Sequence, residues 1–583
     1  MNVLKLFVRH NKSGIKTKYV WMVLCIIMFV TTVFYCSGDL GATASHGIYL
    51  WESIFSGNFF LVYSDFIQNP LTIIAYYTPS LYFLFAVWNF PVYILYKLGM
   101  PFLRDITILT FGVMIWNKIL LFLFIFLMIW AIDNIAQTYQ ISDVNRKMLS
   151  FSVASSFLVI YPSLIMGQYD VISAAISLFG ISAYLKNEEK KFMIAFMIAS
   201  GFKFFSILIY IPLILLEEKN ILKVAVKSSL ALFIPILSKV LFCRDVAYTY
   251  VGEFSKQKTF SLLEKTVPGN YSAVPIVAIL LIGVCIFAYV TSSERKKDYT
   301  IYLSFAVFGI MFCFMAFGPY WIILIAPYAI LICFLNLGKD QKTSANFLMV
   351  FAIEISMCIL TLYYHHDNLD YALLYRGLLY NKLKFRPPAF SVYGFVQNHG
   401  LGTYVTCIAG VFITCIFCLF IINLPSKQKE VVKLYEQELA VHDRWTLYIK
   451  SLVTVLFMGV TTLCFVVPFK LSYNFLELSY NGKFKEEPDG YYVLEESSVT
   501  SKSLVLQPGE YDIEIIGEGL AAEGMEYYVQ DYGEFAGAHD FHISDDKVKF
   551  MLSIPQYSED IKIVINTKDN QIKIKKMKIM HSE

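Results

Sequence analysis

Long apolar runs separated by short polar turns occupy most of the chain up to about residue 468. Most have about 17–25 residues, the length that an α-helix needs to cross the hydrocarbon core of a bilayer. The pattern predicts a polytopic α-helical membrane protein with about 12–13 transmembrane helices. The apolar runs lie near 20–36, 108–131, 149–166, 170–185, 192–216, 223–242, 273–291, 299–317, 320–336, 345–363, 403–423 and 447–467.

The pattern changes from about residue 469, where apolar and polar residues alternate between turn signals. Runs such as 511–516, 547–552 and 561–565 have the period of two that is typical of half-buried strands. Several such runs in succession favour an antiparallel sandwich. We therefore expect a membrane domain over 1–468 and an extracytoplasmic β-sandwich domain over 469–583.

Clusters of lysine and arginine predict the orientation, because cytoplasmic turns of membrane proteins are enriched in both residues. The N-terminal segment is basic, and so are the turns near 146, 190 and 296. These turns share one side only if 80–98 lies outside the membrane and 192–216 forms two half-helices broken at Gly201. We then expect a multi-pass protein of the cell membrane with a cytoplasmic N-terminus, an extracytoplasmic C-terminal domain and outer loops at 37–107, 243–272 and 364–402.

Composition supports a membrane protein and excludes several other classes. Of the 583 residues, 57% are hydrophobic and only 16% are charged, whereas soluble proteins carry about 25% charged residues. The net charge of +3 gives no reason to expect a nucleic-acid partner, and membrane lipids are the expected surroundings. The eleven cysteines lie in or beside apolar runs, which argues against a disulfide framework.

Charged groups at the edge of a membrane are costly and mark candidate functional sites. Asp39 directly follows the first apolar run and is a candidate general base, with a solvated helix end as the alternative. Gln168 and Asp170 join two apolar runs, where Asp170 could cap the next helix or contact a ligand. Lys203 lies where the chain is expected to turn at the outer face and could hold a phosphate as a point charge.

Two weaker candidates are also cationic. Lys118 lies early in the run 108–131, where either a snorkelling lysine or a phosphate ligand fits the pattern. Arg376 belongs to the loop 364–402, in which basic residues alternate with tyrosines and could accommodate a sugar phosphate. A solvated loop face is the alternative for Arg376.

Several of these residues lie in motifs that resemble one family. Gly167-Gln168-x-Asp170 resembles the Trp-Gly-Gln-x-Asp signature of bacterial glycosyltransferases related to the GPI mannosyltransferases, which belong to the GT-C superfamily. Met166 takes the place of the tryptophan. The segment 77–82, which begins at Tyr77, resembles the Tyr-Pro-Pro-Leu-Tyr motif of that family, with Thr78 separating the tyrosine from the proline. The segments 117–118 and 318–321 are similar to further family motifs, and the resemblance covers roughly residues 15–340.

The resemblance implies an enzyme that transfers a hexose, with mannose favoured, from a polyprenyl-phosphate donor to a glycan or lipid-linked acceptor at the outer leaflet. Asp39 would deprotonate the acceptor in an inverting displacement. Lys203 and Lys118 would hold the carrier phosphate. Gln168 and Asp170 would orient the substrates, or Asp170 would bind a divalent cation such as Mg²⁺ or Mn²⁺. Tyr77 would contact substrate.

Two other functional classes fit the hydropathy pattern. A non-catalytic flippase or transporter of lipid-linked saccharides would show broken helices at corresponding positions of two repeated halves, and no such pairing is evident in the sequence. A polysaccharide polymerase or ligase would depend on the loop 364–402 and would not require Asp39.

Overall fold

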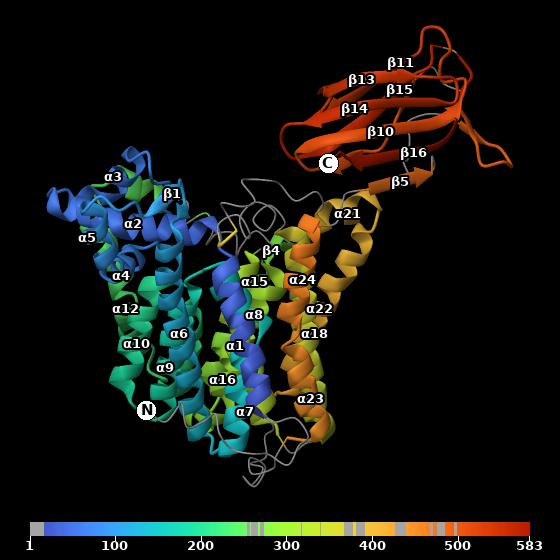
Figure 1. The fold of residues 1–583 in the computed structure, drawn as a ribbon. Helices are drawn as coiled ribbons and strands as arrows, with labels where there is room; N and C mark the ends of the chain where they lie inside the picture. Colours follow the sequence, from blue (N-terminus) through green and yellow to red (C-terminus); the bar gives the residue numbers. More distant parts are fainter. Residues whose placement is uncertain are drawn as a thin grey trace. The chain divides into compact units, whose positions relative to one another are not determined.

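The computed structural model describes residues 17–252, 257, 266–268, 273–315, 317–337, 340–365, 377–379, 391–425, 439–466, 470–474, 484–494, 498–568 and 570–582. It confirms a polytopic helical membrane protein with a C-terminal β domain (Figure 1). The chain divides into two compact units. The first contains most of the helices, and the second contains the C-terminal strands together with the described residues of 359–365 and 391–408.

The helices follow the predicted apolar runs closely. In chain order they are α1 (Thr17–Phe34), α2 (Gly38–Phe55), α3 (Val62–Gln68), α4 (Pro79–Trp88), α5 (Phe90–Lys97), α6 (Phe111–Thr138), α7 (Asp143–Ala154), α8 (Phe157–Ile160), α9 (Asp170–Leu185), α10 (Glu189–Phe202), α11 (Ser206–Glu217), α12 (Ile221–Ala231), α13 (Phe233–Leu241), α15 (Ile276–Val290), α16 (Lys296–Phe314), α17 (Ala326–Leu335), α18 (Asp340–Tyr364), α21 (Val392–Asn398), α22 (Gly402–Ile422), α23 (Val441–Lys450) and α24 (Val453–Val466).

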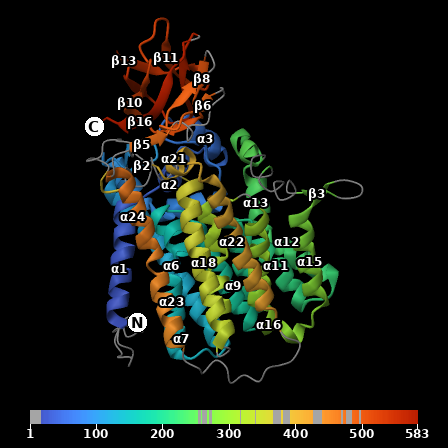
Figure 2. The same cartoon turned by 90° about the vertical axis from the view of Figure 1, so that its right-hand side faces the viewer.

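Several of these helices are long and apolar enough to cross a membrane. Within the described residues five helical segments meet that condition, and nine do so if each of four bent pairs counts as one span. The bent pairs are α1 with α2, α4 with α5, α7 with α8, and α12 with α13. Four further apolar helices, among them α9 and α11, have 10–17 residues. The helices α6, α9 and α16 run through the bundle in both views (Figures 1 and 2).

The segment 37–107, expected as an outer loop, is largely helical. Helices α2 to α5 gather at one end of the bundle (Figure 1), and α4 meets α5 at a bend of 64°. Helix α2 contains glycines that let other segments approach closely. A Cβ atom on Gly41 would lie 1.8 Å from the carbonyl oxygen of Thr107, so the short hairpin of β1 (Leu103–Asp105) and β2 (Ile108–Leu109) can rest directly on α2.

The break expected at Gly201 lies two residues later. Helix α10 ends at Phe202, and α11 begins at Ser206, so that Lys203 falls in the connection. The carbonyl oxygen of Gly201 accepts a hydrogen bond of 2.6 Å from the Thr78 hydroxyl. This bond joins the α10–α11 break to the segment that precedes α4.

The basic turns meet at the other end of the helices. Lys296 lies 2.8 Å from Glu217 and donates to the Asn187 side chain at 3.1 Å. Lys227 forms an ion pair of 2.6 Å with Glu189. These contacts bring together the α9–α10 turn, the end of α11 and the start of α16, so one end of the bundle carries the lysine-rich turns.

The C-terminal strands form two antiparallel sheets. One has seven strands in the order β13-β14-β10-β16-β7-β6, with β5 also paired to β16, and the other has the order β12-β11-β15-β8, with β9 also paired to β15. The strands are β5 (Lys470–Asn474), β6 (Phe484–Glu486), β7 (Tyr492–Leu494), β8 (Ser498–Thr500), β9 (Leu504–Leu506), β10 (Gly509–Glu518), β11 (Glu526–Asp531), β12 (Glu534–Phe535), β13 (Gly537–Ile543), β14 (Lys547–Ile554), β15 (Ser558–Asn566) and β16 (Lys573–His581).

One hydrophobic core lies between these sheets. Its members alternate along the strands, as Tyr511, Ile513 and Ile515 do in β10, and Ile561, Ile563 and Ile565 in β15. Since both sheets contribute to a single core, the domain is a sandwich. Glu514 is the exception in β10, because its side chain is buried yet charged. Its carboxylate pairs with Lys547 and, at 2.7 Å, with Lys578, which lowers the pKa of Glu514 to about 2.

Candidate functional site

A break in the helical region between α8 and α9 positions the first group of candidate residues. After α8 the chain forms one π-helical stretch over Tyr161–Ile165 and leaves it at Met166. Such stretches are frequent at functional sites. Gly167 has φ +69°, and a Cβ atom there would lie 3.0 Å from the Leu40 side chain. Glycine is therefore required where the chain turns to place Gln168 and Asp170.

Asp39 and Gln168 are brought together by this turn. The Gln168 amide donates a short hydrogen bond to the Asp39 carboxylate. Asp39 lies in the first turn of α2 and is partly exposed, whereas Gln168 is buried. A second bond fixes the same junction, because the Ser37 hydroxyl donates to the carbonyl oxygen of Met166 at 2.5 Å. The α1–α2 connection and the Gly-Gln-x-Asp segment are thus one structural unit.

Asp170 and Lys203 form an ion pair beside it. The Lys203 ammonium lies 2.8 Å from the Asp170 carboxylate, with the side chains 14% and 1% exposed. The ammonium also lies 4.6 Å from the centre of the Trp321 ring, a cation–π distance. The capping role considered for Asp170 is wrong, because Tyr169 is the N-cap residue of α9 and the Asp170 carboxylate accepts no aligned hydrogen bond from the described residues.

Aromatic residues line the same region. The rings of Tyr77 and Tyr169 meet edge to face with centroids 4.8 Å apart. Burial raises the pKa of Tyr77 above its ordinary value, and the nearby charge of Asp39 and the phenol of Tyr320 raise it further. Tyr77 therefore stays protonated at neutral pH and can donate a hydrogen bond. Neither Tyr169 nor Trp321 carries a charge, so the pattern of charged residues beside apolar runs did not predict that they belong to this cluster.

Lys118 has a different role from the predicted one. Its fully buried ammonium donates to four backbone carbonyl oxygens, those of Thr31, Thr32, Tyr35 and Leu164. An ammonium has three protons, and these carbonyls occupy all of them. Lys118 therefore joins the end of α1 to the π-helical stretch, and its donors are not available to a phosphate.

Two other predictions concern Arg376 and a divalent cation at Asp170. Arg376 lies outside the described residues, as does most of the loop 364–402. A divalent cation was also considered at Asp170. The Lys203 ammonium already lies beside this carboxylate, and its positive charge opposes the binding of a second cation there. Within the described part of the chain, no group of three His, Cys, Asp or Glu side chains is arranged to hold a metal. The described residues around Asp170 therefore do not fit a divalent cation.

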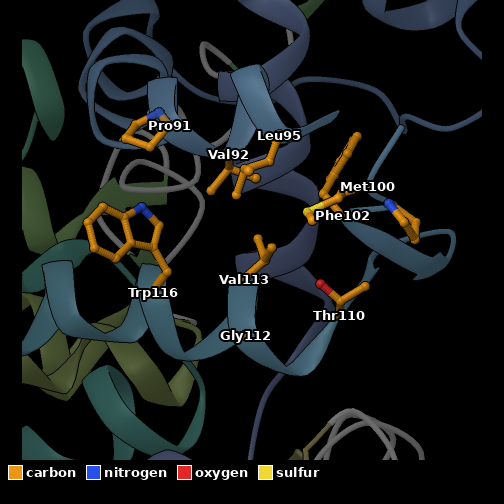
Figure 3. A pocket seen from close by; sticks show the side chains of 10 residues that line it. Pro91, Val92, Leu95, Met100, Phe102, Thr110, Gly112, Val113 and Trp116 are labelled. Carbon is orange, nitrogen blue, oxygen red and sulfur yellow. The ribbon is translucent and has the colours of Figure 1, made fainter. Parts of the chain in front are cut away.

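An apolar pocket lies between α5 and the start of α6 (Figure 3). It encloses about 370 Å³ and is lined by Pro91, Val92, Leu95, Met100, Pro101, Phe102, Thr110, Gly112, Val113 and Trp116. Met100–Phe102 and Thr110 flank the hairpin that rests on α2 at Gly41, two residues after Asp39. The pocket therefore adjoins the element that supports the Asp39 end of α2, although none of the charged candidates lines it.

Comparisons with known proteins give little further information. No family model and no curated protein matches the chain. Among solved structures, the arabinosyltransferase EmbB from Mycobacterium smegmatis is similar at a TM-score of 0.33 and 10% sequence identity, over 98% of this chain and 65% of EmbB. The chain thus spans about two thirds of EmbB. At this TM-score the likeness carries no argument, so the function must be inferred from the residues.

Proposed function

We propose that this chain is a membrane glycosyltransferase of the GT-C type. It transfers a hexose, with mannose favoured, from a polyprenyl-phosphate donor to a hydroxyl of a cell-surface glycan or lipid-linked acceptor. The observation that carries the proposal is the pairing of Asp39 with Gln168 directly beside the Asp170–Lys203 ion pair. Through Gln168 and Asp170, which are two residues apart, one turn thus links a partly exposed carboxylate to an ammonium.

Asp39 acts as the general base in this proposal. It is the partly exposed member of its hydrogen-bonded pair, so an acceptor hydroxyl can approach its carboxylate. The Gln168 amide holds the carboxylate in place from the buried side. A base positioned in this way contributes about 10²–10⁴-fold to the rate.

Lys203 stabilises the leaving group. As the acceptor oxygen bonds to the anomeric carbon, the bond from that carbon to the phosphate oxygen breaks, and its electron pair remains on the phosphate. The ammonium compensates this developing charge, an effect of the kind that dominates many enzyme rate enhancements. Attack on the face opposite the phosphate inverts the anomeric centre. Asp170 keeps Lys203 in position between turnovers, and no step uses a metal.

The surrounding aromatic and apolar residues fit the rest of the donor. The edge-to-face rings of Tyr77 and Tyr169, with the protonated phenol of Tyr77, offer a surface and a hydrogen-bond donor for a sugar ring. The apolar pocket at α5 and α6 offers a place for the first isoprenoid units, since its lining is almost free of polar atoms.

The proposed orientation follows from the distribution of charges. The lysine-rich turns, joined by the Lys296 contacts, face the cytoplasm under the positive-inside rule. The N-terminus would then be cytoplasmic, and the Asp39 cluster and the C-terminal β domain would lie on the outer side of the membrane.

The direct test uses purified protein in lipid nanodiscs with radiolabelled polyprenyl-phosphate mannose, glucose or galactose and a membrane glycan extract as acceptor. We expect transfer from one donor, with mannose the first to be tried, and loss of that transfer in Asp39→Asn. No transfer from any of the three donors, or equal transfer by Asp39→Asn, would refute the proposal.

A further inference from the structure

A second buried ion pair lies in the helical unit, away from the candidate site. Glu354 of α18 and Lys450 of α23 lie 2.9 Å apart, with side chains 0% and 1% exposed. Both residues lie within or at the edge of apolar runs, where a charge is costly and is retained for a reason. The glycosyltransferase mechanism uses neither residue.

The contacts of this pair converge on one point of the chain. Glu354 accepts a hydrogen bond of 2.5 Å from the Ser156 hydroxyl and one of 3.2 Å from the backbone N–H of Phe157. Lys450 also donates to the carbonyl oxygen of Ser152 at 2.8 Å. These are the last turn of α7 and the first residue of α8, on the two sides of a bend of 53°. The ion pair therefore satisfies backbone groups that the bend leaves without helical partners.

The segment that begins at this bend ends in the candidate site. From Phe157 the chain runs through α8 and the π-helical stretch to Met166, whose carbonyl oxygen accepts from Ser37. Lys118 fixes the same stretch at Leu164. The segment 157–166 is thus held at its beginning by Glu354, which pairs with Lys450, and near its end by Lys118. A shift at its beginning would therefore reach Gln168.

We infer that Glu354 and Lys450 are positioning residues for the proposed transfer reaction. They fix the start of the segment 157–166, and through it the Gln168 amide that orients Asp39. Glu354 supplies the negative charge at the N-terminus of α8, and Lys450 makes that charge tolerable in the bundle. The inference rests on the proposed function for its effect on catalysis, while its structural part can be tested without activity.

The experiment compares Glu354→Gln, Lys450→Met, the double variant Glu354→Gln/Lys450→Met and the conservative Glu354→Asp, all as full-length protein in nanodiscs. A single variant can fail to fold because it leaves one buried charge unpaired. The double variant avoids this problem because it removes both charges of the pair. The matched control is Asn346→Leu/Asn423→Leu, which removes a buried reciprocal amide pair between α18 and the residue that follows α22. That pair also involves α18 but has no contact with α7 or α8 among its hydrogen bonds.

Hydrogen exchange gives the readout that does not depend on activity. In Glu354→Gln and in the double variant, amides of 156–166 should exchange at least about tenfold faster than in the wild type, and the control should leave them unchanged. Transfer kinetics give the second readout. We expect kcat to fall about 10–100-fold with KM for the donor changed less than about threefold, because small displacements of catalytic groups act on the reacting geometry. Glu354→Asp should recover part of both losses.

The outcomes separate this inference from the proposed function. Unchanged exchange in 156–166 overturns the inference that Glu354 and Lys450 fix the start of the segment 157–166, whether or not transfer is detected. Faster exchange with a wild-type kcat overturns the positioning role and leaves a structural pair. If no donor supports transfer by the wild type, the proposed function fails. Faster exchange in the variants would still support the structural role of Glu354 and Lys450 at the start of the segment 157–166.

Discussion

Replacing Lys203 by methionine tests the core of the proposed site and has two separable consequences. At 2.8 Å the Coulomb attraction between Lys203 and Asp170 is about 6 kcal/mol for an effective dielectric constant of about 20. Desolvation of both groups offsets much of this energy. Removing one partner of a buried pair nevertheless costs about 3–5 kcal/mol, because the other charge stays buried without compensation. Lys203→Met should therefore lower the apparent Tm by several degrees.

The double variant Lys203→Met/Asp170→Asn separates stability from catalysis. It leaves no unpaired buried charge at this position, so the apparent Tm should return close to that of the wild type. Transfer should remain about 10²–10³-fold reduced in both variants, since a lost electrostatic contact to the transition state costs about that much. The matched control is Lys219→Met, because the Lys219 ammonium binds the carbonyl oxygens of Leu215, Ala288 and Thr291 instead of a carboxylate.

The measurements are thermal unfolding in nanodiscs and kcat/KM for the donor. Lys219→Met should lose stability and retain transfer per folded molecule. The reasoning is refuted if the double variant recovers transfer together with stability. Lys203 would then serve only to compensate Asp170, and the leaving phosphate would need another cation.

Four further predictions concern the base, the metal, the topology and the β domain. Asp39→Asn should reduce transfer by about 10²–10⁴-fold without changing Tm. The Asp65 carboxylate accepts a hydrogen bond from Ser53, and Asp65→Asn should have little effect on transfer. The reverse result would assign the role of the base to Asp65. Transfer should persist in excess EDTA, and a loss that Mg²⁺ or Mn²⁺ restores would show a cation that the mechanism omits. A cysteine at Glu523 should react with an impermeant maleimide on intact cells and one at Lys190 only after permeabilisation; the opposite pattern would invert the orientation. The pKa of Glu514 is about 2 in the folded β domain, against 4.5 in an unfolded chain. This difference contributes about 3 kcal/mol to the stability of the domain. The contribution is fully present above pH 4.5 and is lost as the pH falls toward 2. Pepsin should therefore cleave within 509–582 increasingly over that range in the wild type, and Glu514→Gln should be more susceptible at pH 4.5 and lack this dependence.

The hydropathy pattern was sufficient to predict the membrane helices, the helical run 80–98 and the sandwich, but not helices α2 and α3. Helix α2 contains Gly41, Gly47 and His46, so its sequence has neither the apolarity of a span nor clear amphipathic spacing. It forms a helix because its small residues allow close contact, as at Gly41, and that depends on the tertiary partner. Strands β14, β15 and β16 follow the predicted alternation. Strands β11, β12 and β13 were missed because Tyr527, Tyr528 and Val529 stand in succession in β11, β12 has only two residues, and β13 is almost wholly exposed.

The candidate site was predictable as a set of residues but not as a set of contacts. Asp39, Gln168, Asp170 and Lys203 each stood out as a polar side chain beside an apolar run. Nothing local shows that Lys203 meets a carboxylate while Lys118 meets only carbonyl oxygens, although both are lysines within apolar surroundings. The partner of each lysine depends on which other helix ends at the same level of the bundle. That level is a property of the assembled bundle and not of the local sequence.

The placement of these residues has a common physical cause. Each candidate lies at a break in the helices: Asp39 after α1, Gln168 and Asp170 after the π-helical stretch, and Lys203 between α10 and α11. Breaks leave backbone groups without partners, and within a membrane protein these must be satisfied internally. Lys118, Thr78 and Ser37 do so through bonds to carbonyl oxygens at the three breaks. The side chains that repair the backbone thereby also fix the loops that carry the functional groups, so a change in a repairing residue should impair transfer as well as stability.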